Sequence, residues 1–361
     1  MQITPEVKAQ LEEQKKQCVF CKLISGEMEA KKVFEDNVTI AMLDINPIIK
    51  GHTLFMLKEH YPIMPYIPAD EFKHFFGITA QITKVIKKVM VTTGLNIFIA
   101  NGGPAGQQAP HFLIHFLPRE KGDGFFNFLF QKSVENKPES ISMLTNNFPI
   151  MMNNHFGRNP ASWHKAPGSV GDTPDFLKTI KEESQVVYED EKVLAVITKN
   201  AIANGHIEIY SKEEEKYFEN LSIESASHLF YTASFAATAV FEGLGAQGTN
   251  IILKTGESDD NPEGKLVVHI LPRAMDDNLK SINWQPKQPS YNLDSVVKRI
   301  KDKTWQVKYD DGTKKEVKKE TVVVQPEVVK LGAKKSSNVK KEDKPLNKED
   351  EIRKAIEQMK S

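Results

Sequence analysis

A single fixed offset relates two long stretches of this chain. KVFEDNVTIAML at 32–43 matches VVYEDEKVLAVI at 186–197, and HFLIHFLPR at 111–119 matches KLVVHILPR at 265–273, each pair lying 154 residues apart. No gap is needed to bring the two stretches into register. Solenoid repeats recur every ~20–50 residues. Two copies at the much longer spacing therefore predict two like domains rather than a repeat array.

Each copy carries the same order of predicted elements. In the first copy, VFEDNVTIAMLD alternates and predicts a hairpin with its turn at 35–37, and HTLFML after Gly51 predicts a third strand. Residues 69–90 have an acidic start and the apolar spacing of an amphipathic helix. Two more strands, at 94–102 and 110–118, flank a Gly-rich loop. This order predicts an α+β fold, each domain being an antiparallel sheet of about five strands with packed helices.

These patterns divide the chain into five parts. They are an N-terminal helix (1–15), a first domain (16–130), a linker packed on the domains (131–170), a degenerate second domain (171–285) and a C-terminal extension (286–361). The linker is too apolar for a disordered segment. The extension is basic, since residues 298–361 hold 19 Lys or Arg against 12 Asp or Glu in a chain with 48 of each. We expect it to form a hairpin around 311–312, then a partly disordered tail with a short last helix.

Composition points to a cytoplasmic protein. No window approaches the ~18–20 uninterrupted apolar residues of a membrane span, and the polar N-terminus lacks the apolar core of a signal peptide. The two cysteines, Cys18 and Cys21, cannot build a disulfide framework in a chain of 361 residues. No βαβ pattern surrounds this C-x-x-C pair, so a thioredoxin-like redox role is disfavoured.

The last strand of the first copy presents three chemically informative positions. Side chains two apart on a strand share one face, so His111, Leu113 and His115 should project together. The intervening aromatic and aliphatic residues, Phe112, Ile114 and Phe116, should face the core. The corresponding positions in the second copy are Lys265, Val267 and His269.

Several motifs together resemble the histidine-triad (HIT) family of nucleotide-binding hydrolases and transferases. They are CVFCKLISGEMEAKKVFEDNVTIAMLDINP, GHTLFMLKEH and ANGGPAGQQAPHFLIHFLPREKGDGF, which run from about Cys18 to Phe125, with a weaker match over 172–273. Members of this family are usually homodimers whose last strands and helices meet at a two-fold axis. The resemblance implies that the tandem copies form this dimer within one chain, as an intramolecular pseudo-dimer.

The chain departs from the family at the position that carries its chemistry. In the family, the middle histidine of H-x-H-x-H attacks the α-phosphate and becomes the covalent intermediate. Leu113 stands at that position, and Val267 in the second copy, and neither side chain has a lone pair or a proton to transfer. We therefore expect catalysis to be impaired. His115 is the one residue of the triad face from which a shifted attack is conceivable.

Nucleotide recognition is expected to survive in the first copy. By resemblance, Asp44 accepts hydrogen bonds from the ribose hydroxyls. Amides of the loop at 102–106 surround the phosphate together with side chains from the loop and from behind it, namely Asn101, Gln107, Gln108, His52 and His115. The second copy has Thr198, Thr255, Asn261 and Pro262 for Asp44, Asn101, Gln107 and Gln108. The resemblance thus implies a purine nucleotide or a nucleotide-like phosphate as the ligand of the first copy.

A metal site is expected in the first copy alone. Some family members with the same C-x-F-C start bind zinc through two cysteines and two histidines, at positions matched here by Cys18, Cys21, His60 and His111. The second copy has Asp172, Asp175, Glu214 and Lys265 instead. A closed set of four ligands indicates a structural Zn²⁺. The alternative is a reduced, buried cysteine pair.

Other functions stay open at this point. The chain could act as a nucleotide phosphohydrolase or nucleotidyl transferase on adenosine-type phosphates, or as an interaction scaffold without a ligand. The C-terminal extension is a weak candidate for contact with RNA or protein. Arg119 and Arg273, which close the last strands, could bind anions or form salt bridges. His52 and His206 could be structural residues at the start of a strand.

Overall fold

The computed structural model describes residues 5–158, 170–279, 282–285 and 287–310. The chain divides into two units, Met1–Thr313 and Lys314–Ser361. Every described residue belongs to the first unit. The turn of the expected C-terminal hairpin, the basic tail and the expected last helix lie outside the described residues.

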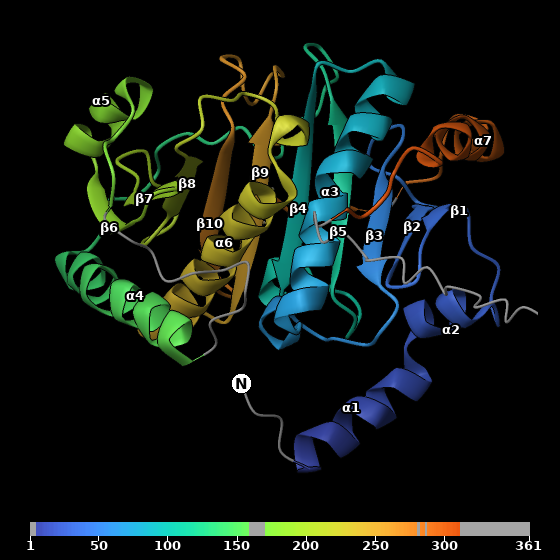
Figure 1. The fold of residues 1–361 in the computed structure, drawn as a ribbon, viewed down its shortest axis with the longest axis horizontal. Helices are drawn as coiled ribbons and strands as arrows, with labels where there is room; N and C mark the ends of the chain where they lie inside the picture. The colour runs from blue at the N-terminus through green and yellow to red at the C-terminus, as the bar shows by residue number, and fades with distance from the viewer. Residues whose placement is uncertain (1–4, 159–169, 280–281, 286, 311–361) are drawn as a thin grey trace, which may run out of the picture. The chain divides into compact units, whose positions relative to one another are not determined.

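The two copies contain the same helices and strands in the same order, except that the short helix η2 occurs in the first copy alone (Figure 1). The first copy comprises α2 (Val19–Ser25), β1 (Lys32–Glu35), β2 (Thr39–Leu43), β3 (Thr53–Leu57), η1 (Met64–Tyr66), α3 (Ala69–Met90), β4 (Gly94–Asn101), η2 (Gly103–Ala105) and β5 (Leu113–Arg119). The second comprises α5 (Asp175–Glu183), β6 (Gln185–Glu189), β7 (Val193–Ile197), β8 (Ile207–Ser211), η3 (Phe218–Asn220), α6 (Ile223–Leu244), β9 (Gly248–Thr255) and β10 (Val267–Arg273). The α+β expectation of five strands and a packed helix in each copy is confirmed.

One continuous sheet joins the copies. Its strand order is β1-β2-β3-β5-β4-β9-β10-β8-β7-β6, with β4 antiparallel to β9 at the centre. Phe98 pairs with Ile252, its own counterpart at the offset of 154, so a pseudo-two-fold axis passes between these two residues. The chain is therefore an intramolecular pseudo-dimer. The expectation that the last strands meet at the axis is wrong, because β4 and β9 form the seam and β5 and β10 lie one strand outward.

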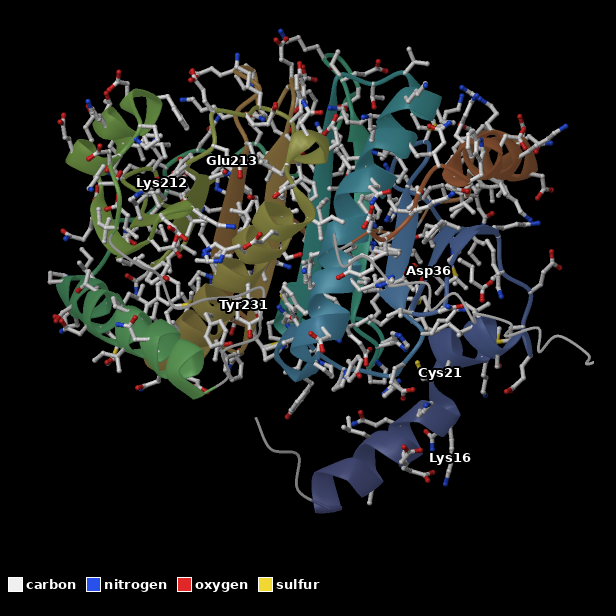
Figure 2. All side chains as sticks on the ribbon, viewed as in Figure 1. Lys16, Cys21, Asp36, Lys212, Glu213 and Tyr231 are labelled. Atoms are coloured by element: carbon white, nitrogen blue, oxygen red, sulfur yellow. The ribbon has the colours of Figure 1, made fainter. Side chains whose placement is uncertain are left out.

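The main core lies between the sheet and two long helices. α3 and α6 run side by side across one face of the sheet (Figure 1). Phe76 of α3 stacks on Phe230 of α6 with ring centroids 4.3 Å apart, and Tyr231, labelled in Figure 2, meets Phe72 at 5.0 Å. Phe112, Ile114 and Phe116 join this core, as expected from the alternation along the strand.

Three further helices flank the two copies. α1 (Pro5–Gln17) precedes the first copy, and α4 (Pro138–Arg158) occupies much of the expected linker and packs against α6 and β6. α7 (Leu293–Thr304) was not foreseen, because the C-terminal extension was expected to begin with a hairpin. It packs against β1 and α3 of the first copy, and residues 307–310 beyond it contain no strand.

The two arginines that close the last strands are structural. Arg119 is fully buried, and its guanidinium donates to Asp123 Oδ2 at 2.7 Å and to Asp260 Oδ1 at 2.6 Å. Arg273 donates to Asp277 and to Asn250 Oδ1, both at 2.5 Å. Both are thus ion-pair partners rather than free anion-binding groups. The Arg119–Asp260 pair also connects the first copy to the second.

No helix within the described residues is long and apolar enough to span a bilayer.

Candidate functional site

A pocket of about 540 Å³ opens on the first copy. Phe98 of β4 and His115 of β5 line it, whereas Ile97 and Ile114, their neighbours along the strands, belong to the core under α3. Because side chains alternate along a strand, the pocket lies on the face of the sheet opposite to α3. Asp44, which follows β2, lies at its wall.

Two histidines and a carboxylate form a chain of contacts behind this pocket. His52 Nε2 lies 2.9 Å from His115 Nδ1, and Asp44 Oδ2 lies 3.4 Å from His52 Nδ1. The backbone N–H of Ile48 points at His52 Nδ1 at 3.4 Å, and since an N–H can only donate, Nδ1 accepts. His52 then donates through Nε2 to His115 Nδ1, which leaves His115 with its proton on Nε2.

Burial keeps both imidazoles neutral. His52 is fully enclosed, and burial lowers its pKa to about 3. Burial also lowers the pKa of His115 to about 3, and the nearby His52 adds to this effect. Neither ring is therefore a cation at neutral pH.

Leu113 occupies the position at which the resemblance places the nucleophile. It is the first residue of β5, is half-buried, and borders the pocket beside His111 and His115. Its side chain packs on a small apolar cluster that includes Leu54 and Met42. The strand geometry thus presents all three triad positions to one pocket, and the middle position is hydrocarbon.

The side chains at the glycine-rich loop form hydrogen bonds within the fold. Gln107 borders the pocket, but its amide donates to Pro62 O and Ala109 O, and its Oε1 accepts from Gly102 N at 2.8 Å. Asn101 does not border the pocket, and it donates to Thr249 Oγ1 of the second copy at 3.2 Å. Gln108 does border it. Asn101 and Gln107 thus bond to the seam and the loop in this structure, and their expected phosphate contacts stay predictions.

An aromatic residue from beyond the second copy completes the pocket. The ring of Trp284 lies 5.0 Å from Phe98, 5.3 Å from His115 and 5.6 Å from His52, measured between centroids. Phe130, its counterpart at the offset of 154, lies 5.0 Å from His269 in the same way. We did not single out Trp284 from the sequence, although extending the offset to an aromatic pair beyond the strands would have found it.

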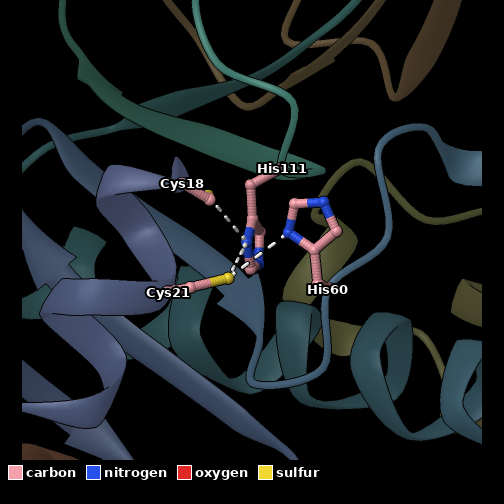
Figure 3. Close-up of side chains that lie close together, drawn as sticks. All are labelled: Cys18, Cys21, His60 and His111. Atoms are coloured by element: carbon pink, nitrogen blue, oxygen red, sulfur yellow. Dashed lines mark hydrogen bonds between the residues drawn. The ribbon is translucent and has the colours of Figure 1, made fainter. Parts of the chain in front are cut away.

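Two cysteines and two histidines converge on one another (Figure 3), and one of the four, His111, also borders the pocket. Cys21 extends from α2, as Figures 2 and 3 show, and Cys18 caps that helix, while His60 follows β3 and His111 precedes β5. Cys18 Sγ lies 3.6 Å from His111 Nδ1, and Cys21 Sγ lies 3.3 Å from His60 Nδ1. Donor atoms of all four residues lie within 4.8 Å of one another, so they could hold a metal ion.

The tautomer of His111 suits this arrangement. Its Nε2 lies 3.0 Å from the carbonyl oxygen of Leu57, which can only accept, so Nε2 carries the proton. The lone pair is then on Nδ1, the atom that faces both sulfurs. A hydrogen bond of this kind to a backbone carbonyl is the usual orienting contact of a metal-binding histidine.

The second copy lacks the cysteine–histidine cluster but keeps the histidine pair. Asp172, Asp175, Glu214 and Lys265 are all exposed and form no cluster of donors within the described residues. His206 and His269 keep their contact at 3.1 Å. Glu208 replaces Leu54 beside them, and burial raises the pKa of its carboxyl.

Comparison with known proteins finds matches to both copies. The HIT domain model matches residues 25–122 and 180–276. An uncharacterized HIT-like protein from Methanocaldococcus jannaschii is 45% identical over 107 residues, 30% of this chain and 82% of that protein. The adenylylsulfatase of Arabidopsis thaliana is 36% identical over 106 residues, 29% of this chain and 54% of that protein. The adenosine 5′-monophosphoramidase of Candida albicans is 34% identical over 107 residues, 28% of this chain and 70% of that protein. The chain therefore belongs to the HIT domain family and contains two HIT domains.

Proposed function

We propose that the first HIT domain binds a purine nucleotide or nucleotide-like phosphate and that its catalysis is impaired, because Leu113 replaces the nucleophilic histidine. One observation carries the proposal. Leu113 borders the pocket at the nucleophile position, whereas Asp44 and the His52–His115 pair remain around it. The side chains expected to recognise the nucleotide are thus present, whereas the histidine expected to react with it is absent.

The chemistry of each residue supports this division. The carboxylate of Asp44 has acceptor capacity left beyond the N–H of Asn46, so it can bind ribose hydroxyls. The leucine side chain can neither form a bond to phosphorus nor protonate a leaving group. Loss of a covalent nucleophile costs several orders of magnitude in rate.

The second candidate is a nucleotide hydrolase or transferase that uses His115. It is favoured by the position of His115 at the pocket wall and by the names of the Candida albicans and Arabidopsis thaliana relatives. Against it, the lone pair of His115 lies on Nδ1, where His52 donates to it. Attack through Nε2 would require both rings to exchange tautomers.

We further propose that Cys18, Cys21, His60 and His111 hold a structural Zn²⁺. Tetrahedral zinc with Zn–S near ~2.3 Å and Zn–N near ~2.0–2.1 Å sets adjacent sulfur and nitrogen ligands about 3.5 Å apart. Three of the sulfur–nitrogen distances in this cluster are 3.3, 3.6 and 3.6 Å. A closed set of four protein ligands leaves no position for substrate, so the ion would stabilise the fold rather than react.

The test combines binding with turnover on one preparation. Isothermal titration calorimetry of zinc-replete protein with AMP and GMP measures binding, and hydrolysis of an adenosine phosphoramidate measures activity. We expect binding without turnover, and turnover in Leu113→His. Val267→His, the same change in the second domain, is the matched control and should remain inactive.

Three outcomes would redirect the interpretation. Clear wild-type turnover that disappears in His115→Ala would favour the enzyme over the binding protein. Absence of both binding and turnover in a folded sample would favour an interaction scaffold without ligand. Turnover that survives His115→Ala would identify a reacting group outside the triad face.

A further inference from the structure

Strand β9 of the second HIT domain lies against the glycine-rich loop of the first domain, residues 102–106. A Cβ atom on Gly248, the first residue of β9, would come within 2.8 Å of Asn101 O and 3.2 Å of Ala105 N. A side chain at this position would therefore force one backbone away from the other. The loop that borders the first pocket is thus built directly on the second domain.

This loop has little stiffness of its own. Gly102 and Gly106 have φ angles of 90° and 93°, and glycine changes between such conformations and others at little cost. Bonds inside the loop close its turns, since Gly106 N donates to Gly103 O at 2.9 Å. The carbonyl of Ala105 instead points out of the loop, toward the second domain. The orientation of the peptide between Ala105 and Gly106 therefore depends on what that carbonyl meets.

Asn250 of β9 meets this carbonyl. The fully buried side chain donates through Nδ2 to Ala105 O at 2.8 Å and to Ile99 O at 3.3 Å. Its Oδ1 accepts from Arg273 Nη1 at 2.5 Å. Because a peptide unit is planar, holding the Ala105 carbonyl also fixes the plane that leads into Gly106, which borders the pocket. Asn250 thus acts on the pocket wall through the loop, without bordering the pocket itself.

The equivalent contact in the opposite direction is different. Asn96 of β4 is the counterpart of Asn250, but its Nδ2 donates to the side chain of Asp260, at 2.9 Å. Asp260 is in turn the counterpart of Gly106. The second copy's loop is therefore reached through a side chain, whereas the first copy's loop, with a glycine at this position, is held by its backbone. Asn96 is as buried as Asn250 and has the same place on the seam, which makes it a matched control.

We propose that Asn250 is a positioning residue for ligand binding, so that the second HIT domain supports the pocket of the first. The inference rests on the proposed nucleotide binding, in which amides of the loop surround the phosphate. Backbone N–H groups bind an anion when the backbone holds them in a fixed orientation. Fixing the peptide beside Gly106 orders the loop before the ligand arrives, which lowers the ordering cost of binding.

Two measurements on the full-length protein test this. Hydrogen exchange followed by mass spectrometry reports on residues 102–107 without ligand, and calorimetry with AMP reports on affinity. Asn250→Asp keeps the size of the side chain and the acceptor for Arg273, but it sets a carboxylate oxygen against the Ala105 and Ile99 carbonyls. We expect faster exchange of the loop and weaker AMP binding, each by about tenfold, because the hydrogen bonds to the loop are lost. Asn250→Ala should act in the same direction.

The control variant is Asn96→Ala, which removes the same kind of buried amide from the same seam. It should lower Tm, as Asn250→Ala does, while loop exchange and AMP affinity keep their wild-type values. Equal loss of AMP affinity in both variants would overturn the inference, because a general weakening of the seam would then explain the loss.

The other outcomes separate the inference from the proposed function. AMP binding of wild-type strength in both Asn250 variants, with or without faster loop exchange, would overturn the inference and leave the proposed function standing. Loop amides that exchange freely in the wild type would overturn it without any variant, because the loop would then not be held. Absence of AMP binding by the folded wild-type protein would overturn the proposed function, and with it the role of Asn250 in ligand binding.

Discussion

The buried ion pair between the two copies should be the most sensitive point of the fold. Asp260 of the second copy is enclosed, and each of its oxygens accepts a hydrogen bond from the first copy. Oδ1 accepts from Arg119 Nη1 at 2.6 Å and Oδ2 accepts from Asn96 Nδ2 at 2.9 Å. In Asp260→Asn, the new amide NH₂ would therefore face a donor in either orientation of the side chain, Arg119 Nη1 in one and Asn96 Nδ2 in the other.

The expected size of the effect follows from burial. Removal of one partner of a buried pair costs ~3–5 kcal/mol, because the remaining charge is left uncompensated. Arg119 keeps Asp123 at 2.7 Å, so the lower end, about 3 kcal/mol, applies. With an unfolding entropy of ~2.1 cal/mol/K per residue over roughly 300 folded residues, this corresponds to a fall in Tm of about 5 °C.

The control is an ion pair that joins the same two copies at the surface. Lys121 and Glu257 lie 2.9 Å apart with side chains 61% and 52% exposed, so Glu257→Gln should leave the stability almost unchanged, because water screens an exposed pair. Scanning calorimetry and urea unfolding of both variants provide the measurement. If Asp260→Asn melted within about 1 °C of the wild type, or if both variants lost equal stability, burial of the pair would not be what stabilises the seam.

Three further predictions concern the metal site, a buried carboxylate and the pocket wall. Cys21→Ser should abolish zinc binding, measured by mass spectrometry, and lower Tm. Asp175→Asn, at the exposed counterpart of that cysteine, should change neither. Zinc retained by Cys21→Ser would contradict the proposed ligand set. Burial alone would raise the pKa of Asp36, but hydrogen bonds led by that from His74 outweigh it and lower the pKa to about 2. Since the folded pKa is depressed, Asp36 should contribute about 2 kcal/mol at neutral pH, lost as the pH falls from about 3.8 toward about 2. Urea unfolding of Asp36→Asn should show that deficit at pH 7 but not at pH 2, and an equal deficit at both would refute the linkage. Trp284→Ala should weaken ligand binding several-fold in calorimetry at unchanged zinc content, and unchanged affinity would remove the ring from the binding site.

Local patterns predicted the elements of each copy well. The helix expected over 69–90 is α3 with the same bounds, because its apolar spacing and acidic first turn are contained in the segment itself. The same holds for the hairpin of β1 and β2 around Asp36, whose carboxylate accepts from the N–H groups of Val38 and Thr39. The resemblance placed four metal-ligand candidates, and the fold brings them together.

The sequence analysis missed α7 although its segment carries local helix signals: Asn292 caps it by accepting from Ser295 N, and Leu293, Val296 and Ile300 recur at helical spacing. What could not be read locally is its docking, where Thr304 donates to Val33 O at 2.8 Å across 271 residues of sequence. The bonds that Gln107 forms inside its loop could not be read from the sequence either. A glycine-rich segment shows that the backbone can turn tightly, but not whether its N–H groups point outward or close on the loop itself.

One substitution near the seam distinguishes how the two copies hold the segment after their last strand. Lys254 of β9 is buried, donates to Phe128 O at 2.6 Å and lies 4.0 Å from the ring of Phe130. It thereby fastens that segment over the histidines of the second copy. Its counterpart at the offset of 154 is Ala100, which borders the pocket of the first copy. Trp284 nevertheless lies against His115 as Phe130 lies against His269, with ring centroids 5.3 and 5.0 Å apart. The aromatic cover is therefore common to both copies, whereas the buried ammonium that contacts it belongs to the second copy.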